Sequence, residues 1–375
     1  MRVLHISPAI FGDSGVVGGA ERYALELAKH MAAEVPTLFA AFGDQPRTEQ
    51  MGDLPVHVLG PASYVRGQRA NPIARSLLSE IRRADVIHCH QQHILASSVA
   101  SAACRLTGRK VFVSDLGGGG WDVSAYVSTD RWYHGHLHIS EYSRTVFGHA
   151  GKPWAHVIYG GVDTAKFSPD QQVPKDGTVL FVGRLLPHKG IDDLIQAVPA
   201  DMQLEVIGRP SNPRYFDDLR ALAQGKRVSF RTACSDDEII EAYRRAAAIV
   251  LPSVYQTMYG EKSNVPELLG QTLLEGMACG TPAICTDVAS MPEVVEDRVT
   301  GFVVPPNRPD ALRERLLWMR AHAAETRAMG EAARRHVLHK FTWPAVVRRC
   351  LEIYQAPLRS PISASELVSA QEPMK

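Results

Sequence analysis

Two glutamates, Glu267 and Glu275, stand eight positions apart in the stretch PELLGQTLLEGMACGTPAI. A carboxylate accepts strong hydrogen bonds from vicinal hydroxyls, such as those of a ribose or a hexose. Eight helical residues advance about 12 Å, less if the first lies in a loop, so the two carboxylates can hold opposite ends of one elongated ligand. They are too far apart to act as acid and base on one bond. Taken alone, the pair is better explained as two solvated glutamates near the start of a helix.

The residues between the two glutamates predict a site for an anion. If Gly270 opens a helix, the first backbone amides of that helix have no intrahelical acceptor and point outward, an arrangement that binds phosphate groups. The amides concerned are those of Leu268, Leu269, Gly270, Gln271 and Thr272. The stretch therefore suits a ligand with hydroxyls at both ends and a diphosphate in the middle, which describes a nucleotide sugar.

Two cations support this interpretation. In FVGRLLPHKG, Arg184 ends a predicted strand and Lys189 follows in the loop before the next helix. A guanidinium fork and an ammonium point charge at a strand end can both reach phosphate oxygens. Fixed cations beside a departing diphosphate also stabilise the negative charge that builds there in the transition state. A single loop cation is usually solvated, so the prediction depends on both cations lying beside the helix start.

The first helix of the chain offers a second place where a ligand can approach the backbone. The segment GVVGGAERYALELA puts Gly18 and Gly19 at the start of this helix, after the first strand, and glycine permits close approach. The spacing differs from G-x-G-x-x-G, and no acidic residue follows cleanly at a second strand end, so a dinucleotide site is only weakly indicated. A tight turn with a purely structural role is an equal alternative.

The elements that position these residues alternate along the whole chain. Short strands and amphipathic helices run from RVLHIS to AHVIYGG, stop at the polar segment DTAKFSPDQQVPKDGT, and restart at VLFVGR. Such alternation predicts parallel βαβ units with helices on both faces of a sheet. We therefore expect an α/β protein of two facing, Rossmann-like, doubly wound domains, with the ligand in an interdomain cleft at the carboxyl ends of the strands. The expected bounds are 1–165 for the first domain, 166–177 for a linker, 178–342 for the second domain, 343–358 for a last helix and 359–375 for a flexible tail.

The composition excludes several classes of protein. The 375 residues include 41 basic and 40 acidic side chains and 45% hydrophobic residues, which is typical neither of disordered chains nor of dedicated nucleic-acid-binding proteins. The longest apolar runs are far shorter than the roughly 20 residues of a membrane-spanning helix, and Pro8 and Asp13 interrupt any signal peptide. Six cysteines without a C-x-x-C pair indicate reduced thiols. These features favour a cytoplasmic location.

Together the motifs resemble those of the family 4 glycosyltransferases, retaining enzymes of the GT-B fold. The likeness extends over nearly the whole chain and is carried by GGAER, HISEYSR, VIYGGVDTAKFSP, GRLLPHKG, the E-x7-E signature in PELLGQTLLEGMACGTPAI, and PEVVEDRVTGFVVPP. The resemblance implies that Glu267 contacts the donor sugar, that Glu275 contacts the nucleotide ribose, and that Arg184 and Lys189 hold the diphosphate. It also implies that Gly19 lies near the donor phosphates or the acceptor, and that the final helix crosses back onto the first domain.

The chain departs from this family near the reacting carbon. Relatives often present a histidine at the end of the strand that corresponds to KVFVSD, where this chain has Ser114 and Asp115; Asp115 is our candidate for that role. The family requires no metal, and the chain has no D-x-D pair to hold Mg²⁺, so we expect no cofactor. His88 and His90 in HCHQQH have the spacing of zinc ligands, but we interpret them as polar residues of the cleft.

The resulting hypothesis is a retaining glycosyltransferase that moves a hexose-type sugar from a UDP- or GDP-sugar to a hydroxyl of a glycan, glycolipid or small molecule, in cell-surface polysaccharide synthesis. Front-side attack is favoured, because no nucleophile stands near HKG. Two alternatives remain: a nucleotide-sugar 2-epimerase of the same fold, and a non-catalytic nucleotide-sugar sensor.

Partners beyond the donor and acceptor are only weakly indicated. A group of basic residues in the first half suits peripheral contact with an anionic membrane, and a solvated face explains it at least as well. The group consists of Arg66, Arg69, Arg75, Arg82, Arg83, Arg105, Arg109 and Lys110. No nucleic-acid partner is expected, and the sequence indicates no oligomeric state.

Overall fold

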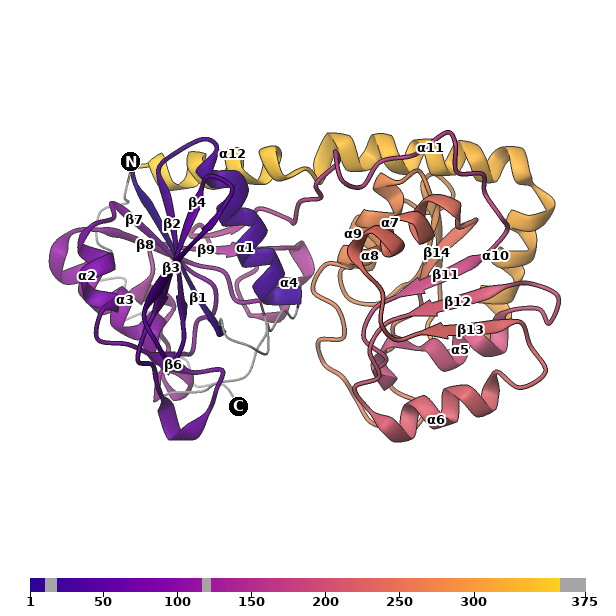
Figure 1. The fold of residues 1–375 in the computed structure, drawn as a ribbon, viewed down its shortest axis with the longest axis horizontal. Helices are drawn as coiled ribbons and strands as arrows, with labels where there is room; N and C mark the ends of the chain where they lie inside the picture. Colours follow the sequence, from indigo (N-terminus) through magenta and orange to yellow (C-terminus); the bar gives the residue numbers. More distant parts are fainter. Residues whose placement is uncertain (11–18, 117–122, 358–375) are drawn as a thin grey trace.

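The computed structural model describes residues 1–10, 19–116 and 123–357. The first half of the chain forms one α/β lobe and the second half forms another beside it (Figure 1). Each lobe is built on its own sheet, flanked by helices. The prediction of two Rossmann-like, doubly wound domains is therefore confirmed. The predicted tail at 359–375, like Gly18, lies outside the described residues.

The first domain contains an eight-stranded sheet in the order β10-β9-β8-β7-β1-β2-β4-β3. Neighbouring strands are parallel except at the edge, where β3 pairs antiparallel with β4. The sequence did not predict β3, because its residues RTEQM are polar and mostly exposed. The strands are β1 (Val3–Ile10), β2 (Thr37–Phe42), β3 (Arg47–Met51), β4 (Leu54–Leu59), β7 (Val86–Cys89), β8 (Lys110–Val113), β9 (Gly135–His138) and β10 (Ala155–Val157). The helices are α1 (Gly19–Ala32), α2 (Leu77–Arg82), α3 (Leu95–Thr107) and α4 (Glu141–Val146), and β5 (Ser63–Tyr64) pairs with β6 (Pro72–Ile73) in a small separate sheet.

The second domain contains a fully parallel six-stranded sheet in the order β13-β12-β11-β14-β15-β16. Numbered within the domain this is 3-2-1-4-5-6, the strand order of dinucleotide-binding Rossmann folds, in which ligands bind where the order reverses. Here the reversal lies between β11 and β14. The strands are β11 (Val179–Val182), β12 (Leu204–Ile207), β13 (Val228–Arg231), β14 (Ala248–Leu251), β15 (Ala283–Thr286) and β16 (Gly301–Val304). The helices are α5 (Ile191–Ala197), α6 (Pro213–Leu222), α7 (Asp236–Arg245), α8 (Gln271–Ala278), α9 (Met291–Val294), α10 (Pro309–Ala321) and α11 (Ala323–Lys340).

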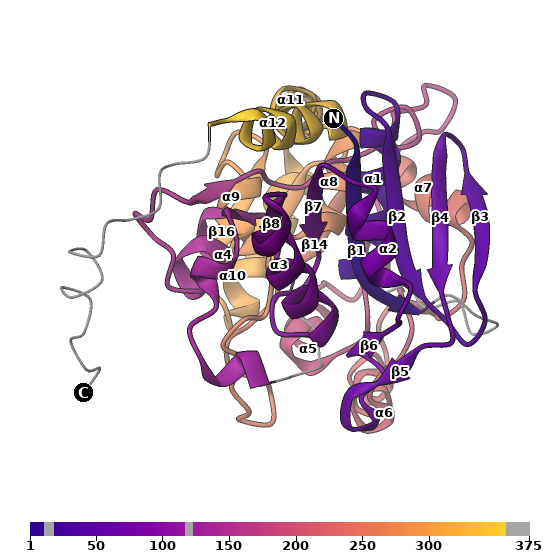
Figure 2. The ribbon, with the colours of Figure 1, turned by 90° about the vertical axis from the view of Figure 1, so that its left-hand side faces the viewer.

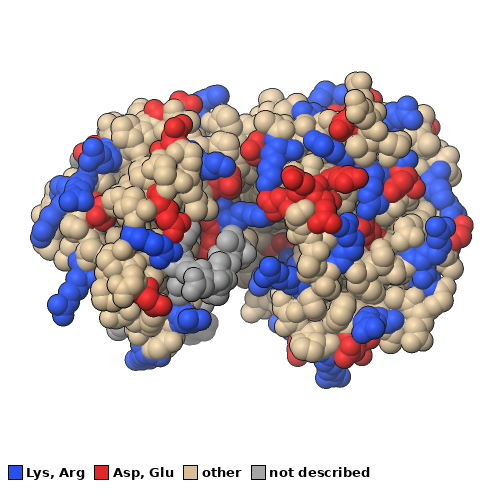
Figure 3. All heavy atoms as spheres, in the orientation of Figure 1, with Lys and Arg blue, Asp and Glu red and all other residues tan. Residues whose placement is uncertain are grey.

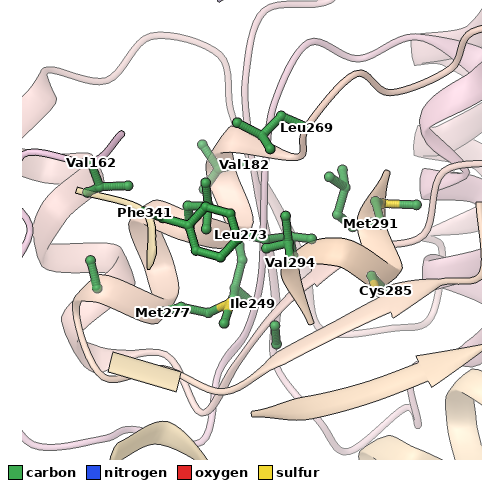
Figure 4. Close-up of a cluster of buried hydrophobic side chains, with 14 of the residues drawn as sticks. Val162, Val182, Ile249, Leu269, Leu273, Met277, Cys285, Met291, Val294 and Phe341 are labelled. Carbon is green, nitrogen blue, oxygen red and sulfur yellow. The ribbon is translucent and has the colours of Figure 1, made fainter. Parts of the chain in front are cut away.

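The core of the second domain fixes the position of α8. Figure 4 shows Leu273 and Met277 of α8 among the buried side chains, together with Ile249 of β14. A Cβ atom added to Gly276 would lie 2.9 Å from Cγ2 of Ile249, so the helix packs directly on the strand. This packing holds the start of α8 at the carboxyl edge of the sheet. Among the described helices, none combines the length and the apolar composition that spanning a bilayer requires.

The last helix, α12 (Trp343–Gln355), runs along the first domain, whereas α11 lies along the second (Figures 1 and 2). The hydroxyl of Tyr354 lies 2.7 Å from Nδ1 of His88, and Nζ of Lys110 donates to the carbonyl oxygen of Tyr354 at 2.7 Å. These bonds anchor α12 on the first sheet. The interpretation of His88 as a cleft residue is wrong, because its side chain is completely buried and bonded to α12.

The chain crosses between the lobes twice, and the two crossings touch. Val162 donates its amide hydrogen to the carbonyl oxygen of Phe341 at 2.8 Å, and Val162 forms a parallel bridge with Thr342. Gly161 stands at the closest approach, since a Cβ atom there would lie 2.5 Å from Cδ2 of Trp343. Figure 4 shows Val162 and Phe341 side by side.

Candidate active site

The reversal point of the second sheet brings together a lysine, a glutamate and a serine. Lys189 ends the short 3-10 helix η4 (Pro187–Lys189) that follows β11, while Ser253 and Glu267 follow β14. Nζ of Lys189 donates to Oε1 of Glu267, and Oγ of Ser253 donates to the same oxygen at 3.1 Å. The side chains of Lys189 and Glu267 are only 14% and 11% exposed. Such shielding strengthens the attraction between them relative to a surface ion pair.

The loop that carries Lys189 is held against the loop after β14. Gly190 adopts a left-handed φ of 64°, and a Cβ atom at this position would lie 2.0 Å from the carbonyl oxygen of Pro252. Val254 donates its amide hydrogen to the carbonyl oxygen of His188 at 2.9 Å. Only glycine fits between the loops, which explains the Lys-Gly pair in the sequence and fixes where the ammonium lies.

Arg184 lies in the same loop and is exposed. Within the described ranges, no carboxylate forms an ion pair with its guanidinium, so this charge is available to a ligand. Burial, together with the nearby charges of Lys189 and Arg184, lowers the pKa of His188 to about 4. His188 is therefore neutral at neutral pH, and the two flanking residues supply the positive charge of the loop.

The start of α8 presents backbone donors beside Glu267. Gly270 is the N-cap with φ of 82°, as expected for a glycine that opens a helix. The amides of Gly270, Gln271 and Thr272 donate to no acceptor among the described residues, which leaves them available to an anion. The Leu269 side chain is buried, so this residue can offer a ligand only its backbone.

Glu275 faces the interior rather than open solvent. Its side chain is 7% exposed and accepts a hydrogen bond from the hydroxyl of Tyr243 on α7 at 2.9 Å. Burial raises the pKa of Glu275 to about 7, although the bond from Tyr243 and the charge of Arg22 act in the opposite direction. The structure thus places Glu275 against the last turn of α7, where Tyr243 lies, and not in the Lys189–Glu267 pair.

The raised pKa of Glu275 predicts a pH-dependent stability. A carboxyl whose pKa is higher in the folded state binds its proton more tightly there, so its contribution is favourable at low pH and is lost as the pH rises. Between about pH 5.5 and pH 8, wild type should lose about 2 kcal/mol relative to Glu275→Gln. Urea unfolding of both proteins at the two pH values measures this. A difference that does not change with pH would contradict the assignment.

Gly19 and Asp115 are the candidate site residues of the first domain that the structure describes. Gly19 is the first residue of α1, and no described atom lies within 4 Å of a Cβ atom added there. Asp115 follows the carboxyl end of β8 and is half-buried. It borders residues 117–122, which are outside the described ranges, so its role near the reacting carbon stays a prediction.

Glu293 connects the two domains at a point that the sequence did not reveal. Its carboxylate, on α9, accepts hydrogen bonds from the amides of Glu141 at 2.8 Å and Tyr142 at 2.7 Å, the first residues of α4 in the first domain. A negative charge at a helix N-terminus also interacts favourably with the helix dipole. The hydroxyl of Tyr142 in turn donates to the carbonyl oxygen of Asn264 at 2.8 Å. These contacts hold the lobes together.

Glu293→Ala is expected to loosen the contact between the lobes. The variant loses both bonds to α4 while its own domain stays intact, so small-angle scattering should show a larger or more variable radius of gyration than wild type. Glu331→Ala, which removes an exposed glutamate of α11, is the matched control and should scatter like wild type. Identical profiles for all three proteins would mean that Glu293 does not hold the lobes.

The sequence provides little indication of three further residues that the structure places in contact with the candidates or between the lobes: Ser253, Tyr243 and Glu293. Ser253 stands directly after the strand AIVL and its proline, a strand-end position that could have marked it. Tyr243 lies one helix before Glu275 and has no motif of its own. Glu293 belongs to the quoted motif PEVVEDRVTG, but its partner is backbone, which no pattern of side chains predicts.

The basic residues proposed for a membrane surface have partly structural roles. Nε of Arg105 donates to the carbonyl oxygen of Trp132 at 3.3 Å, and Nε of Arg109 donates to that of Ala84 at 3.0 Å. Lys110 binds the end of α12, as described above. Over the visible face, basic and acidic side chains are intermixed on both lobes (Figure 3). Membrane contact stays a prediction.

Family models match both domains. Residues 17–166 match the model described as Glycosyltransferase Family 4, and residues 163–336 match the model described as Glycosyl transferases group 1. Each half of the chain is therefore similar to a glycosyltransferase domain, the first to family 4 and the second to group 1. The group 1 domain contains Arg184, Lys189, Glu267 and Glu275, and the resemblance inferred from the motifs is confirmed at the level of the two domains.

Curated relatives of these glycosyltransferase domains include two enzymes with named products or substrates. Alpha-maltose-1-phosphate synthase of Mycolicibacterium smegmatis is 30% identical over 228 residues, 53% of this chain and 56% of the relative. D-inositol 3-phosphate glycosyltransferase of Streptomyces bingchenggensis is 28% identical over 229 residues, 54% and 48%. The chain thus spans about half the length of the curated relatives it matches.

Solved structures share the fold over almost the whole chain. The Anabaena protein HepE in complex with UDP and glucose superposes with a TM-score of 0.70 at 19% identity, over 94% of this chain and 98% of that one. Sucrose-phosphate synthase from Thermosynechococcus elongatus gives 0.70 at 21% identity, over 99% and 100%. At this identity the likeness establishes the GT-B arrangement of the glycosyltransferase domains.

Proposed function

We propose that the chain is a retaining glycosyltransferase that moves a hexose-type sugar from a UDP- or GDP-sugar to a hydroxyl of a glycan, glycolipid or small molecule. The observation that carries this proposal is the shielded Lys189–Glu267 pair at the reversal point of a Rossmann sheet. Glu267 lies three residues before Gly270, the N-cap of a helix whose first amides have no acceptor among the described residues. The family models, the named relatives and the UDP complex of a structural neighbour support a nucleotide-sugar donor. Synthesis of cell-surface polysaccharide would use such a reaction.

Each residue has a role that follows from its place. The free amides of Gly270, Gln271 and Thr272 and the charges of Arg184 and Lys189 bind the diphosphate of the donor. Glu267 accepts hydrogen bonds from sugar hydroxyls through the oxygen that Lys189 does not occupy. Glu275 accepts a hydrogen bond from the ribose once its carboxylate turns away from Tyr243. The cations and amides hold the diphosphate without a metal ion.

The reaction proceeds by front-side attack. The acceptor oxygen bonds to the anomeric carbon on the face that the diphosphate leaves, and the leaving phosphate oxygen takes the proton of the acceptor hydroxyl. The negative charge that develops on the diphosphate is greatest in the transition state, so Lys189 and Arg184 raise the rate as well as the affinity. Contact between the lobes excludes water, which would otherwise hydrolyse the donor.

A screen of UDP-, GDP- and ADP-sugars by thermal shift is the first test. A donor present at 100 times its dissociation constant stabilises the folded protein by about 2.7 kcal/mol, so the correct nucleotide should raise the melting temperature clearly. Failure of every nucleotide sugar to shift it would refute the donor site.

Release of nucleoside diphosphate then separates the proposed reaction from its rivals. Release that requires an acceptor supports transfer. Conversion of the donor to its epimer without an acceptor would identify a 2-epimerase, and binding without any turnover would identify a sensor.

A further inference from the structure

Two clusters in the first domain each place three potential metal ligands within reach of one ion. His5, His88 and His90 form one, and Asp130, His136 and His149 form the other. In each, the potential ligand atoms lie within 4.8 Å of one another. The two clusters differ in charge, in access and in which nitrogen atoms are already bonded.

The cluster of three histidines is closed to an ion. Nδ1 of His5 lies 2.8 Å from Nε2 of His90, so these two nitrogens share a hydrogen. His88 uses Nε2 for Ser114 at 2.9 Å and Nδ1 for Tyr354 at 2.7 Å. The three rings are buried, and none of the three residues supplies negative charge. Nδ1 of His90 has no partner among the described residues, but hydrogen bonds occupy the other ring nitrogens of this cluster.

The second cluster combines a carboxylate with two imidazoles and is open on one side. Asp130 begins the 3-10 helix η3 (Asp130–Trp132), His136 lies on β9, and His149 follows α4. Oδ1 of Asp130 lies 3.5 Å from Nε2 of His149, which is longer than an ordinary hydrogen bond. The His149 side chain is 6% exposed but that of Asp130 is 33% exposed, so an ion has a path from solvent.

The distance between these atoms suits an ion between them. Zinc binds nitrogen and carboxylate oxygen at about 2.0–2.2 Å in tetrahedral geometry, which places two ligand atoms about 3.3 Å apart. Nε2 of His136 donates to the backbone carbonyl oxygen of Asp130 at 3.2 Å, so this ring faces the same residue, and an ion bound by that nitrogen would replace the bond. Two imidazoles and one carboxylate are a common ligand set for divalent transition metals.

Neighbouring residues orient the ligands as a metal site requires. Nδ1 of His149 lies 3.0 Å from Nε2 of His138, so His149 can donate there and direct the lone pair of its other nitrogen at Asp130. Metal-bound histidines regularly donate their second ring hydrogen in this way. Nε2 of Gln92 donates to Oδ1 of Asp130 at 3.0 Å, and Trp154 packs against the rings of both His136 and His149.

We propose that Asp130, His136 and His149 bind a divalent transition-metal ion, with zinc the best match, and that water takes the fourth position. The ion is separate from the donor diphosphate and takes no part in its binding. It connects η3 and β9 to the loop after α4, the helix whose first amides bind Glu293 of the second domain. The site thus stabilises the part of the first domain that contacts the second.

Metal binding by the untagged, chelator-treated full chain tests this proposal. Titration with Zn²⁺ by calorimetry, or in competition with a chromophoric chelator, should show one equivalent bound with micromolar or tighter affinity. Zn²⁺ should also raise the melting temperature, because it binds the folded state. Mg²⁺, which prefers six oxygen ligands, should do neither. Co²⁺ should give the intense visible bands of a tetrahedral site.

Matched variants locate the ion. Asp130→Asn and His149→Gln should each weaken Zn²⁺ binding at least about 10-fold, while His339→Gln, an exposed histidine of α11, should leave it unchanged. Absence of binding to wild type at 100 µM Zn²⁺ would overturn the proposal even if a variant failed to fold. Loss of binding in His5→Gln, with full binding in Asp130→Asn, would overturn it too, because the ion would then occupy the other cluster.

Discussion

Lys189→Met is expected to lower the rate of sugar transfer by roughly 10²–10³-fold, the cost of removing one preorganised group that stabilises charge in a transition state. The ammonium stands at the reversal point of the second sheet, where its loop is fixed by the contact between Gly190 and Pro252. Methionine retains most of the stem and removes the charge. The variant should fold, because Glu267 keeps its bond from Ser253.

Nucleoside diphosphate release in the presence of acceptor measures this effect. Lys152→Met is the matched control, since Lys152 is an exposed lysine of the first domain and its removal should leave the rate unchanged. A rate within a few-fold of wild type for Lys189→Met would show that this ammonium does not face the departing diphosphate.

Glu267→Gln is expected to abolish transfer and also to destabilise the fold by about 3 kcal/mol. Removing the charge of Glu267 leaves the Lys189 ammonium shielded from water without a negative partner. An uncompensated buried charge destabilises the fold by more than the ion pair stabilises it. From the sequence alone we would expect only the loss of activity. The contact between the two side chains adds the loss of stability, which urea unfolding measures.

The double variant Lys189→Met with Glu267→Gln separates the two effects. It should recover most of the lost stability, because no charge is left unpaired, but it should stay inactive, because neither group can serve the donor. Stability changes that simply add would mean that the two side chains do not interact. Recovery of activity in the double variant would contradict the assigned roles.

The sequence predicted the parts of the site that depend on local order. The N-cap at Gly270 follows from a glycine ahead of an apolar helix, and the position of Lys189 follows from a Lys-Gly pair in the loop after a strand. The contact between Lys189 and Glu267 could not be predicted, since the residues are 78 positions apart. It depends on β11 and β14 being neighbours, which only the order of strands in the sheet determines.

The burial of Glu275 was missed for a related reason. A glutamate on a short helix is expected at the surface. The carboxylate of Glu275 is buried because α7 packs against α8 and places Tyr243 beside it. Helix-to-helix contacts of this kind depend on tertiary packing and leave no periodic signal. His88 was misplaced in the same way, because a buried partner on α12 satisfies it.

The two crossings between the lobes limit how the protein can open. They are bonded to each other at Val162 and Phe341, and Gly161 lies too close to Trp343 to accept a side chain without displacement. Two connections that meet along one line act as a hinge, so the lobes can rotate about that line but cannot separate in parallel. Rotation that opens the lobes would break the hydrogen bonds between Glu293 and α4, and the proposed donor would enter from the side opposite the hinge.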